Sequence, residues 1–190
     1  VLLVCDVAEA LAYSHSQRVV HRDIKPENVF ICNGPAMLAD FGIARAQTST
    51  ETALTQPGLV IGTTAYMSPE QALGEADLEG SSDLYSLGCM MFEMLTGEQP
   101  FRGPNSMSVV AQHLTAEPPE LRIDDPVRGP RLGALIRQLL AKERNDRPTS
   151  AGALLEVLRP LSHSTSDDMP VVVAAPPSKV QPESRKATET

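Results

Sequence analysis

The run His-Arg-Asp-Ile-Lys-Pro-Glu-Asn at residues 21–28 brings together side chains that could transfer a phosphoryl group. Transfer from ATP to a hydroxyl needs a carboxylate to accept the proton, a cation beside the γ-phosphate and an oxygen ligand for magnesium. Asp23, Lys25 and Asn28 provide these groups within one short loop, and Pro26 stiffens the turn that presents them. The alternative interpretation is a charged turn between two strands.

Asp40 is a second candidate ligand for magnesium. It follows the apolar residues 37–39 and precedes Phe41-Gly42. An aspartate after a strand is usually a turn residue, so this motif is weak by itself. Together with Asn28, however, it offers the hard oxygen ligands that Mg²⁺ prefers. Carboxylate and amide oxygens of this kind favour magnesium over zinc as a bound cation.

The scaffold for these residues is predicted to be mostly helical, with a few short strands near its start. Residues 2–17 carry apolar side chains at three- and four-residue steps, which is typical of an amphipathic helix. Residues 19–20, 29–31 and 37–39 are short runs of strand-forming residues. Asn33-Gly34 is a strong turn signal, so we expect a hairpin between the last two runs.

Helices dominate the rest of the predicted scaffold. Ser81-Ser82-Asp83 is expected to supply the cap and a first-turn acid of a helix. Its residues 84–95 are apolar nearly all round, so the helix should be buried on every face. Pro160 is expected to close the last helix of the chain. Further helices are predicted at 105–114, 132–140 and 150–160.

Composition narrows the class of protein. The net charge of −8 argues against a nucleic-acid partner, because an acidic surface repels phosphates. The cysteines Cys5, Cys32 and Cys89 are widely spaced, which favours reduced core thiols over disulfides or a zinc site. No apolar run reaches the roughly 18 residues of a membrane helix, so we expect a cytoplasmic domain with no membrane segment in this chain. The longer protein could be tethered to a membrane elsewhere.

Three motifs, in order, resemble the catalytic part of a protein kinase. Residues 21–28 resemble the catalytic loop, Asp40-Phe41-Gly42 the magnesium-binding segment, and residues 62–70 the end of the activation segment. Lys25, two residues after Asp23, resembles the form specific for serine and threonine. The match from residue 1 to about 158 is similar to the eukaryotic-like serine/threonine kinases of bacteria.

The resemblance implies a fold and a division of the chain. Residues 1–160 would form the large, mainly helical C-terminal lobe of the α+β kinase fold, with short β-hairpins around the catalytic loop 21–28 and an activation segment at 40–70. Residues 161–190 are rich in Ser and Pro and are predicted to be a disordered tail or linker. The glycine-rich loop and strand lysine of the small lobe do not occur in the sequence, and the chain starts without methionine. We therefore expect a fragment that lacks the small lobe.

The resemblance also implies roles for the residues that meet the substrates. Asp23 would be the catalytic base and Lys25 would contact the γ-phosphate of ATP. Asn28 and Asp40 would hold Mg²⁺ on the phosphates. The Thr63 hydroxyl would contact Asp23 and Lys25 and help to fix a serine or threonine of the protein substrate.

A second group of residues would support the site by resemblance. His21 belongs to the loop motif, Phe41 would pack inward and Gly42 would let the backbone turn.

Glu70 would pair with Arg147 and pin the activation segment, although two unrelated solvated charges are the alternative. Asp83 would accept backbone N–H bonds from the catalytic loop, although it could simply be an acid at a helix start. Ser68 stands where the family usually has alanine.

The polar segment 47–58 is predicted to be a mobile loop whose phosphorylation activates the enzyme. Arg22, beside the catalytic aspartate, would need a counter-charge that a phosphate supplies. Self-association could then serve phosphorylation of one copy by another. The alternative is that these hydroxyls only keep the loop soluble. Thr55 is the leading site, with Thr48, Ser49, Thr50 and Thr52 as others.

Three functions fit these observations to different degrees. A serine/threonine protein kinase accounts for all the motifs, and the intact set of Asp23, Lys25, Asn28 and Asp40 favours it. A naturally truncated, non-catalytic relative that binds partners is the alternative, favoured by the missing small lobe. An acidic interaction module explains the polar tail but none of the motifs.

Overall fold

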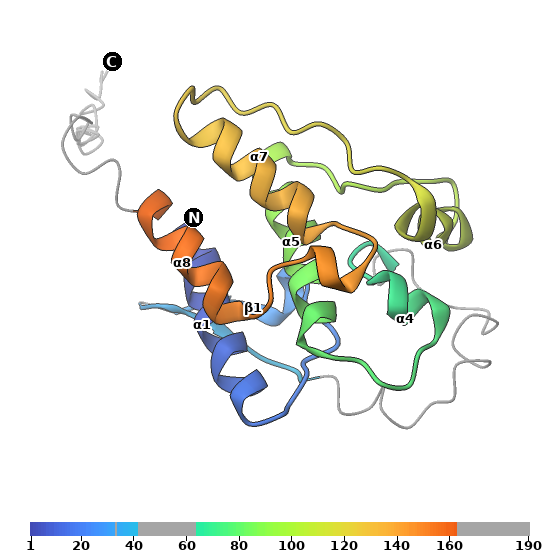
Figure 1. Cartoon of the computed structure of the whole chain (residues 1–190), viewed down its shortest axis with the longest axis horizontal. Coiled ribbons are helices and arrows are strands. Elements are labelled where there is room, and N and C mark those ends of the chain that lie inside the picture. The colour runs from blue at the N-terminus through green and yellow to red at the C-terminus, as the bar shows by residue number, and fades with distance from the viewer. Residues whose placement is uncertain (33, 42–63, 163–190) are drawn as a thin grey trace, which may run out of the picture.

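The computed structural model describes residues 1–32, 34–41 and 64–162. In these ranges helices make up most of the molecule and a two-stranded sheet lies beside them (Figure 1), so the predicted fold class is confirmed. None of the helices in these ranges is long and apolar enough to cross a bilayer. The elements are α1 (Leu2–Ser16), β1 (Val29–Ile31), β2 (Ala36–Leu38), α4 (Pro69–Leu73), α5 (Gly80–Thr96), α6 (Ser106–Thr115), α7 (Arg128–Leu139) and α8 (Ala151–Ser162), with short 3₁₀ turns at Pro26–Asn28 and Arg144–Asp146.

Helix α5 lies at the centre of the helical body (Figure 1). Every residue from Ser82 to Phe92 is buried, as the apolar pattern predicted. Helix α7 approaches closely at Gly88, where an added Cβ atom would lie 2.7 Å from the Cβ of Leu139. The prediction was wrong for the last turn, because Met94 and Leu95 are exposed. The helix is longer than the core that it crosses, so its end meets solvent.

Helices α1 and α8 lie side by side although they are far apart in the sequence (Figure 1). Val7 and Leu11 of α1 are buried, as are Leu154 and Leu158 of α8. This apolar seam confirms the predicted amphipathic helix at residues 2–17. It also anchors the element that leads directly into the catalytic loop.

Strands β1 and β2 form the expected antiparallel hairpin, with Phe30 opposite Met37. The sheet rests on α1, where the Asp6 carboxylate accepts the N–H of Ala36 at 2.8 Å. Asn33 of the predicted turn lies outside the described residues. Residues 19–20 do not form the expected strand, because the N–H of Val19 donates to the carbonyl of Ser14 at the end of α1.

Two predicted helix ends were wrong. Helix α5 starts at Gly80 and its N-cap is Glu79 without a side-chain bond, so the expected serine cap is absent, whereas Asp83 lies in the first turn as predicted. Helix α8 continues through Pro160 to Ser162, since burial of Leu161 against the core favours one more turn. The predicted tail from residue 163 onward lies outside the described residues.

Helix α4 was not predicted as a helix, although its start carries a recognisable signal. The Ser68 side chain accepts the N–H of Gln71, and the Gln71 side chain accepts the N–H of Ser68, which is a capping box. Pro69 occupies the first turn, where its missing N–H does no harm. Gly74 ends the helix at a φ of 75°, a value that glycine adopts without strain.

Candidate active site

The catalytic loop is held by a single carboxylate from the buried helix α5. Asp83 accepts the N–H of His21 through Oδ2 and the N–H of Arg22 through Oδ1, both at 2.8 Å. Arg22 has a φ of 69°, which is unfavourable for a residue with a side chain and has to be held by its surroundings. The structure therefore gives Asp83 the contacts expected from the resemblance, rather than those of a plain helix-start acid.

His15, near the end of α1, is a further contact of Asp83 that the sequence did not reveal. Its Nε2 lies 2.8 Å from Asp83 Oδ2. Its ring also fills the space beside Gly80, where an added Cβ would lie 2.6 Å from Nδ1. The helix before the loop and the helix beneath it are thus joined through the same carboxylate.

His21 is fully buried and links three segments of the site. Its Nδ1 accepts the N–H of Asp23 at 3.3 Å, so the ring proton is on Nε2, which donates to the carbonyl of Ala39 at 3.0 Å. The ring of Phe41 lies against it, with ring centroids 4.5 Å apart. Phe41 is therefore packed toward the catalytic loop, as the sequence suggested.

Asp23, Lys25 and Asn28 are brought together in one cluster. Lys25 Nζ lies 2.8 Å from Asp23 Oδ2, and Asn28 Nδ2 donates to the Asp23 carbonyl at 2.7 Å and to Oδ2 at 3.2 Å. The side chains of Asp23 and Lys25 are 19% and 22% exposed, so solvent and substrate can reach them. The result is an oriented carboxylate that borders solvent beside an ammonium group.

Asp40 follows β2, near the segment that carries Asn28. The N–H of Ala39 donates to the Asn28 carbonyl at 2.9 Å, and Asp40 is exposed with a φ of 57°. Asn28 donates through its amide nitrogen, which leaves the side-chain oxygen as an acceptor. The described residues hold no cluster of three His, Cys, Asp or Glu that could bind a metal without help. Two hard oxygen ligands fit Mg²⁺, which completes its shell with phosphates and water.

Glu70 and Arg147 form the buried ion pair that the resemblance implied. Arg147 makes two parallel hydrogen bonds to the carboxylate, at 2.7 and 2.9 Å, and Ser82 Oγ donates to it at 2.5 Å. Burial raises the pKa of the Glu70 carboxyl, but the hydrogen bonds from Arg147 and Ser82 lower it by more, so the pKa lies below its ordinary value. The solvated alternative for this pair is excluded by their burial.

Gln71 is a functional contact that sequence reasoning missed. Its Nε2 donates to the carbonyl of Arg22 at 2.8 Å, while its Oε1 accepts the N–H of Ser68. Helix α4 is thereby tied to the backbone next to Asp23. The Ser-x-x-Gln spacing could have revealed the capping box, but only the fold brings Gln71 to Arg22.

Several predicted residues lie outside the described residues. These are Gly42, Thr63, Thr55 and the other hydroxyl residues of the segment 47–58. Arg22 is described, and its backbone N–H and carbonyl are both used, by Asp83 and Gln71.

The comparisons with known proteins agree with this geometry. The protein kinase domain family matches residues 2–158. The chain is 39% identical over 188 residues to serine/threonine-protein kinase PknB of Mycolicibacterium smegmatis, covering 93% of this chain and 30% of that protein. It is 44% identical over 146 residues to a probable serine/threonine-protein kinase of Streptomyces coelicolor, covering 76% and 22%.

A probable serine/threonine-protein kinase PknB of Corynebacterium glutamicum is 37% identical over 194 residues, covering 99% of this chain and 30% of that protein. The chain thus spans less than a third of the length of these relatives. With the catalytic loop and its anchors arranged as described, the chain belongs to the protein kinase family, among the eukaryotic-like serine/threonine kinases of bacteria.

Proposed function

We propose that the protein containing this chain transfers the γ-phosphate of ATP to serine and threonine hydroxyls of proteins. The observation that carries the proposal is the Asp23 carboxylate, which is oriented by Lys25 and Asn28 on a loop fixed by Asp83. Most of the catalysis of phosphoryl transfer consists of such positioning together with charge stabilisation. The proposed substrates are ATP and proteins. We place the reaction in the cytoplasm because ATP is present there.

In this reaction Asp23 orients the acceptor hydroxyl and takes its proton. The hydroxyl oxygen forms the new bond to the γ-phosphorus while the bond from that phosphorus to the β,γ-bridging oxygen breaks, and ADP leaves. Lys25 is close enough to Asp23 to share its charge with the transferred phosphoryl group. Asn28 and Asp40 would hold Mg²⁺, which supplies positive charge at the phosphates when bound. Thr63 is proposed to help fix the acceptor side chain.

The test is the substitution Asp23→Asn in the whole protein. It removes the proton acceptor but keeps the shape, so kcat should fall by orders of magnitude while ATP affinity stays nearly unchanged. Asp124→Asn is the matched control, because Asp124 is exposed and lies outside the site. Near-normal turnover of the Asp23 variant would refute the proposed role.

The second candidate is a non-catalytic binding protein. The printed sequence contains no G-x-G-x-x-G loop to grip the phosphates of ATP. We therefore expect the 190 residues by themselves to show no measurable protein phosphorylation with Mg-ATP. Calorimetric titration with Mg-ATP and a kinase assay should be run on this chain and on a version extended by the coding sequence upstream. Turnover only in the extended version supports the kinase, whereas inactivity of both supports the binding protein.

Phosphorylation between residues 47 and 58 is proposed to activate the enzyme, with Thr55 as the leading site. Arg22 supports this proposal, because its guanidinium forms no ion pair with a carboxylate of the described residues. A phosphate would bring the missing charge and order the segment. Peptide mapping of the active enzyme should find phosphate there. Full activity after replacing all five hydroxyl residues with alanine would contradict the proposal.

A further inference from the structure

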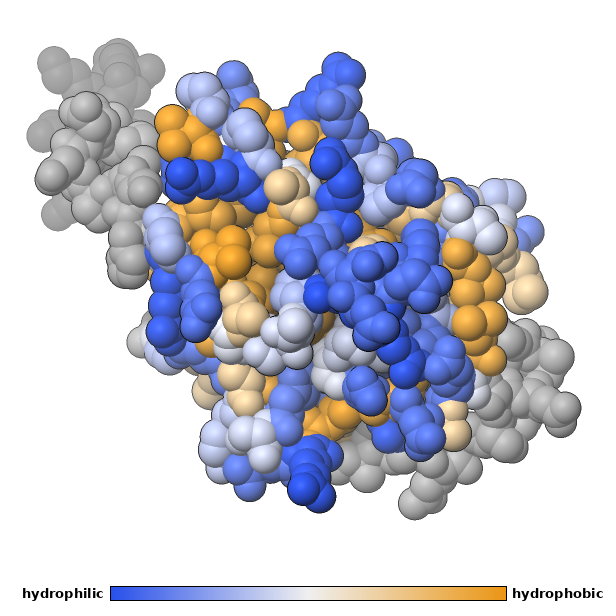
Figure 2. Space-filling model, viewed as in Figure 1, coloured by the Kyte–Doolittle hydropathy of each residue, from blue (hydrophilic) through white to orange (hydrophobic). Residues whose placement is uncertain are grey.

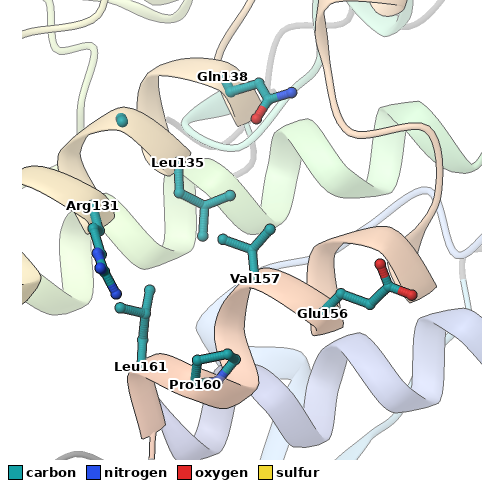
Figure 3. Close-up of a pocket in the computed structure, with 8 residues that line it drawn as sticks. Arg131, Leu135, Gln138, Glu156, Val157, Pro160 and Leu161 are labelled. Carbon is teal, nitrogen blue, oxygen red and sulfur yellow. The ribbon is translucent and has the colours of Figure 1, made fainter.

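Helices α7 and α8 leave an open apolar groove of about 410 Å³ between them. Leu135 and Val157 face each other across its floor, and Figure 3 shows Arg131 and Leu161 at one end and Glu156 at the other. Figure 2 shows apolar side chains gathered between the two helices. Its lining residues are Arg131, Ala134, Leu135, Gln138, Glu156, Val157, Pro160 and Leu161.

The sequence that follows α8 offers a segment of matching chemistry. Residues 171–175 read Val-Val-Val-Ala-Ala and are bounded by Pro170 and Pro176. This is the longest apolar run after Ser162, and it stands in an otherwise polar stretch. Its β-branched side chains can occupy an apolar groove in an extended conformation.

We propose that residues 171–175 bind in the groove between α7 and α8 of the same chain. The charges agree with this placement. Asp167 and Asp168 precede the apolar run, and Arg131, at the end of the groove beside Leu161, forms no ion pair with any carboxylate of the described ranges. The acidic pair therefore reaches the basic end of the groove before the valines enter it.

The lengths also agree. Leu161 is both a wall of the groove and the residue before the end of α8, so the chain leaves α8 at the groove itself. The connecting residues 163–170 would span roughly 15 Å as a flexible linker. The α7 wall from Arg131 to Gln138 is about 10 Å long at the rise of a helix, and five extended residues cover about 16 Å. A tether this short gives a local concentration on the order of millimolar, which favours this segment over a second copy.

The absence of tryptophan from the chain makes a direct test possible. Val172→Trp places a unique fluorophore in the apolar run, and Val180→Trp places one outside it as a control. We expect Val172→Trp to emit at shorter wavelength and to be quenched severalfold less by acrylamide than Val180→Trp. Both measurements use the full 190-residue chain.

Groove variants, each combined with Val172→Trp, then locate the binding site. Val157 is 47% exposed. Val157→Asp should shift the emission of the introduced indole back to the longer wavelength of an indole in water. Val127→Asp, at a position that is 65% exposed and outside the groove, should leave the emission unchanged. Ala134→Asp, on the opposite wall, should have the same effect as Val157→Asp. The conclusion then does not depend on a single variant that could be misfolded.

Three results would overturn the proposal. The first is that the indole of Val172→Trp emits at the same wavelength and is quenched by acrylamide as strongly as that of Val180→Trp. The second is a shifted emission that survives both groove variants, which would mean that the segment binds elsewhere. The third is a shift that disappears on dilution together with a dimer in sedimentation, which would make a second copy the occupant.

Discussion

Two ion pairs in this molecule join a carboxylate to a cation at nearly the same distance but in opposite surroundings. Lys25 and Asp23 lie 2.8 Å apart with about a fifth of each side chain exposed. Arg147 and Glu70 lie 2.7 Å apart and are almost completely buried, with 0% and 2% of their side chains exposed. The first pair belongs to the catalytic loop, and the second joins α4 to the segment after α7.

The surroundings decide what each pair can do. A pair that solvent reaches is screened and contributes little to stability. Each partner can therefore leave the other and contact a substrate group instead. A buried pair cannot be separated without leaving an uncompensated charge, so it fixes geometry. The Lys25–Asp23 pair can thus take part in a reaction, whereas the Arg147–Glu70 pair holds the fold. Asp83 links the two regions, because it lies on the buried helix α5 and accepts backbone N–H groups of the loop that carries Asp23.

Arg147→Met should cause the largest loss of stability. It leaves Glu70 buried without its cation, which costs about 3–5 kcal/mol of the free energy of unfolding. Urea denaturation measures this value. Arg102→Met, which breaks an exposed i,i+4 pair with Glu98, is the matched control and should cost less than about 1 kcal/mol. Equal losses in the two variants would show that burial does not distinguish the pairs.

The pH dependence of the same variant follows from the lowered pKa of Glu70. Because the folded-state pKa lies below the unfolded one, the stabilisation from this carboxylate is present above pH 4.5 and is lost as the pH falls through the folded value. The difference in unfolding free energy between the wild type and Arg147→Met should therefore shrink on acidification, as Glu70 becomes protonated in the folded state. A difference that stays constant on acidification would contradict this assignment.

Asp83→Ala should have the next largest effect. It leaves the N–H groups of His21 and Arg22 without their acceptor, at about 1–3 kcal/mol for each donor that stays buried. Hydrogen exchange should show these two amides opening first, together with a loss of stability in urea. Asp124→Ala, at an exposed position, serves as the control. Unchanged exchange at His21 and Arg22 would mean that the loop is held by other contacts.

Lys25→Met should separate activity from stability. Its free energy of unfolding should change by no more than about 1 kcal/mol, because the lost pair is partly exposed to solvent. The same substitution in the whole protein should lower kcat strongly. A stability loss as large as that of Arg147→Met would remove the distinction between the two pairs.

The effect of Lys142 on stability is visible only when the pH is varied. Burial lowers the pKa of Lys142 to about 8, so between that pH and its ordinary value of 10.5 the unfolded chain holds a proton that the folded chain does not. The contribution of Lys142 to stability should therefore rise between about pH 8 and 10.5, so the difference in unfolding free energy between the wild type and Lys142→Met should change over that range in urea denaturation. A difference between the two proteins that stays constant from pH 8 to 10.5 would contradict the lowered pKa of Lys142.

The sequence alone was enough to predict which residues form the candidate site and to locate the main elements around it. The spacing of Asp23, Lys25 and Asn28 predicted the cluster that the structure brings together, since these three residues share one short loop. Helical periodicity located α1, and the all-round apolar pattern identified the central helix α5, because both signals are local. The short helix α4 was missed, although its capping box is a local signal too.

Tertiary structure decided how those parts are held. His15 on Asp83 and Gln71 on Arg22 are contacts between residues 68 and 49 positions apart, and no local pattern records such pairs. The same holds for the end of α8, where burial of Leu161 outweighed the helix-ending tendency of Pro160. Propensity and spacing act over a few residues, whereas burial depends on which distant elements fold against them, and only the packed chain supplies that information.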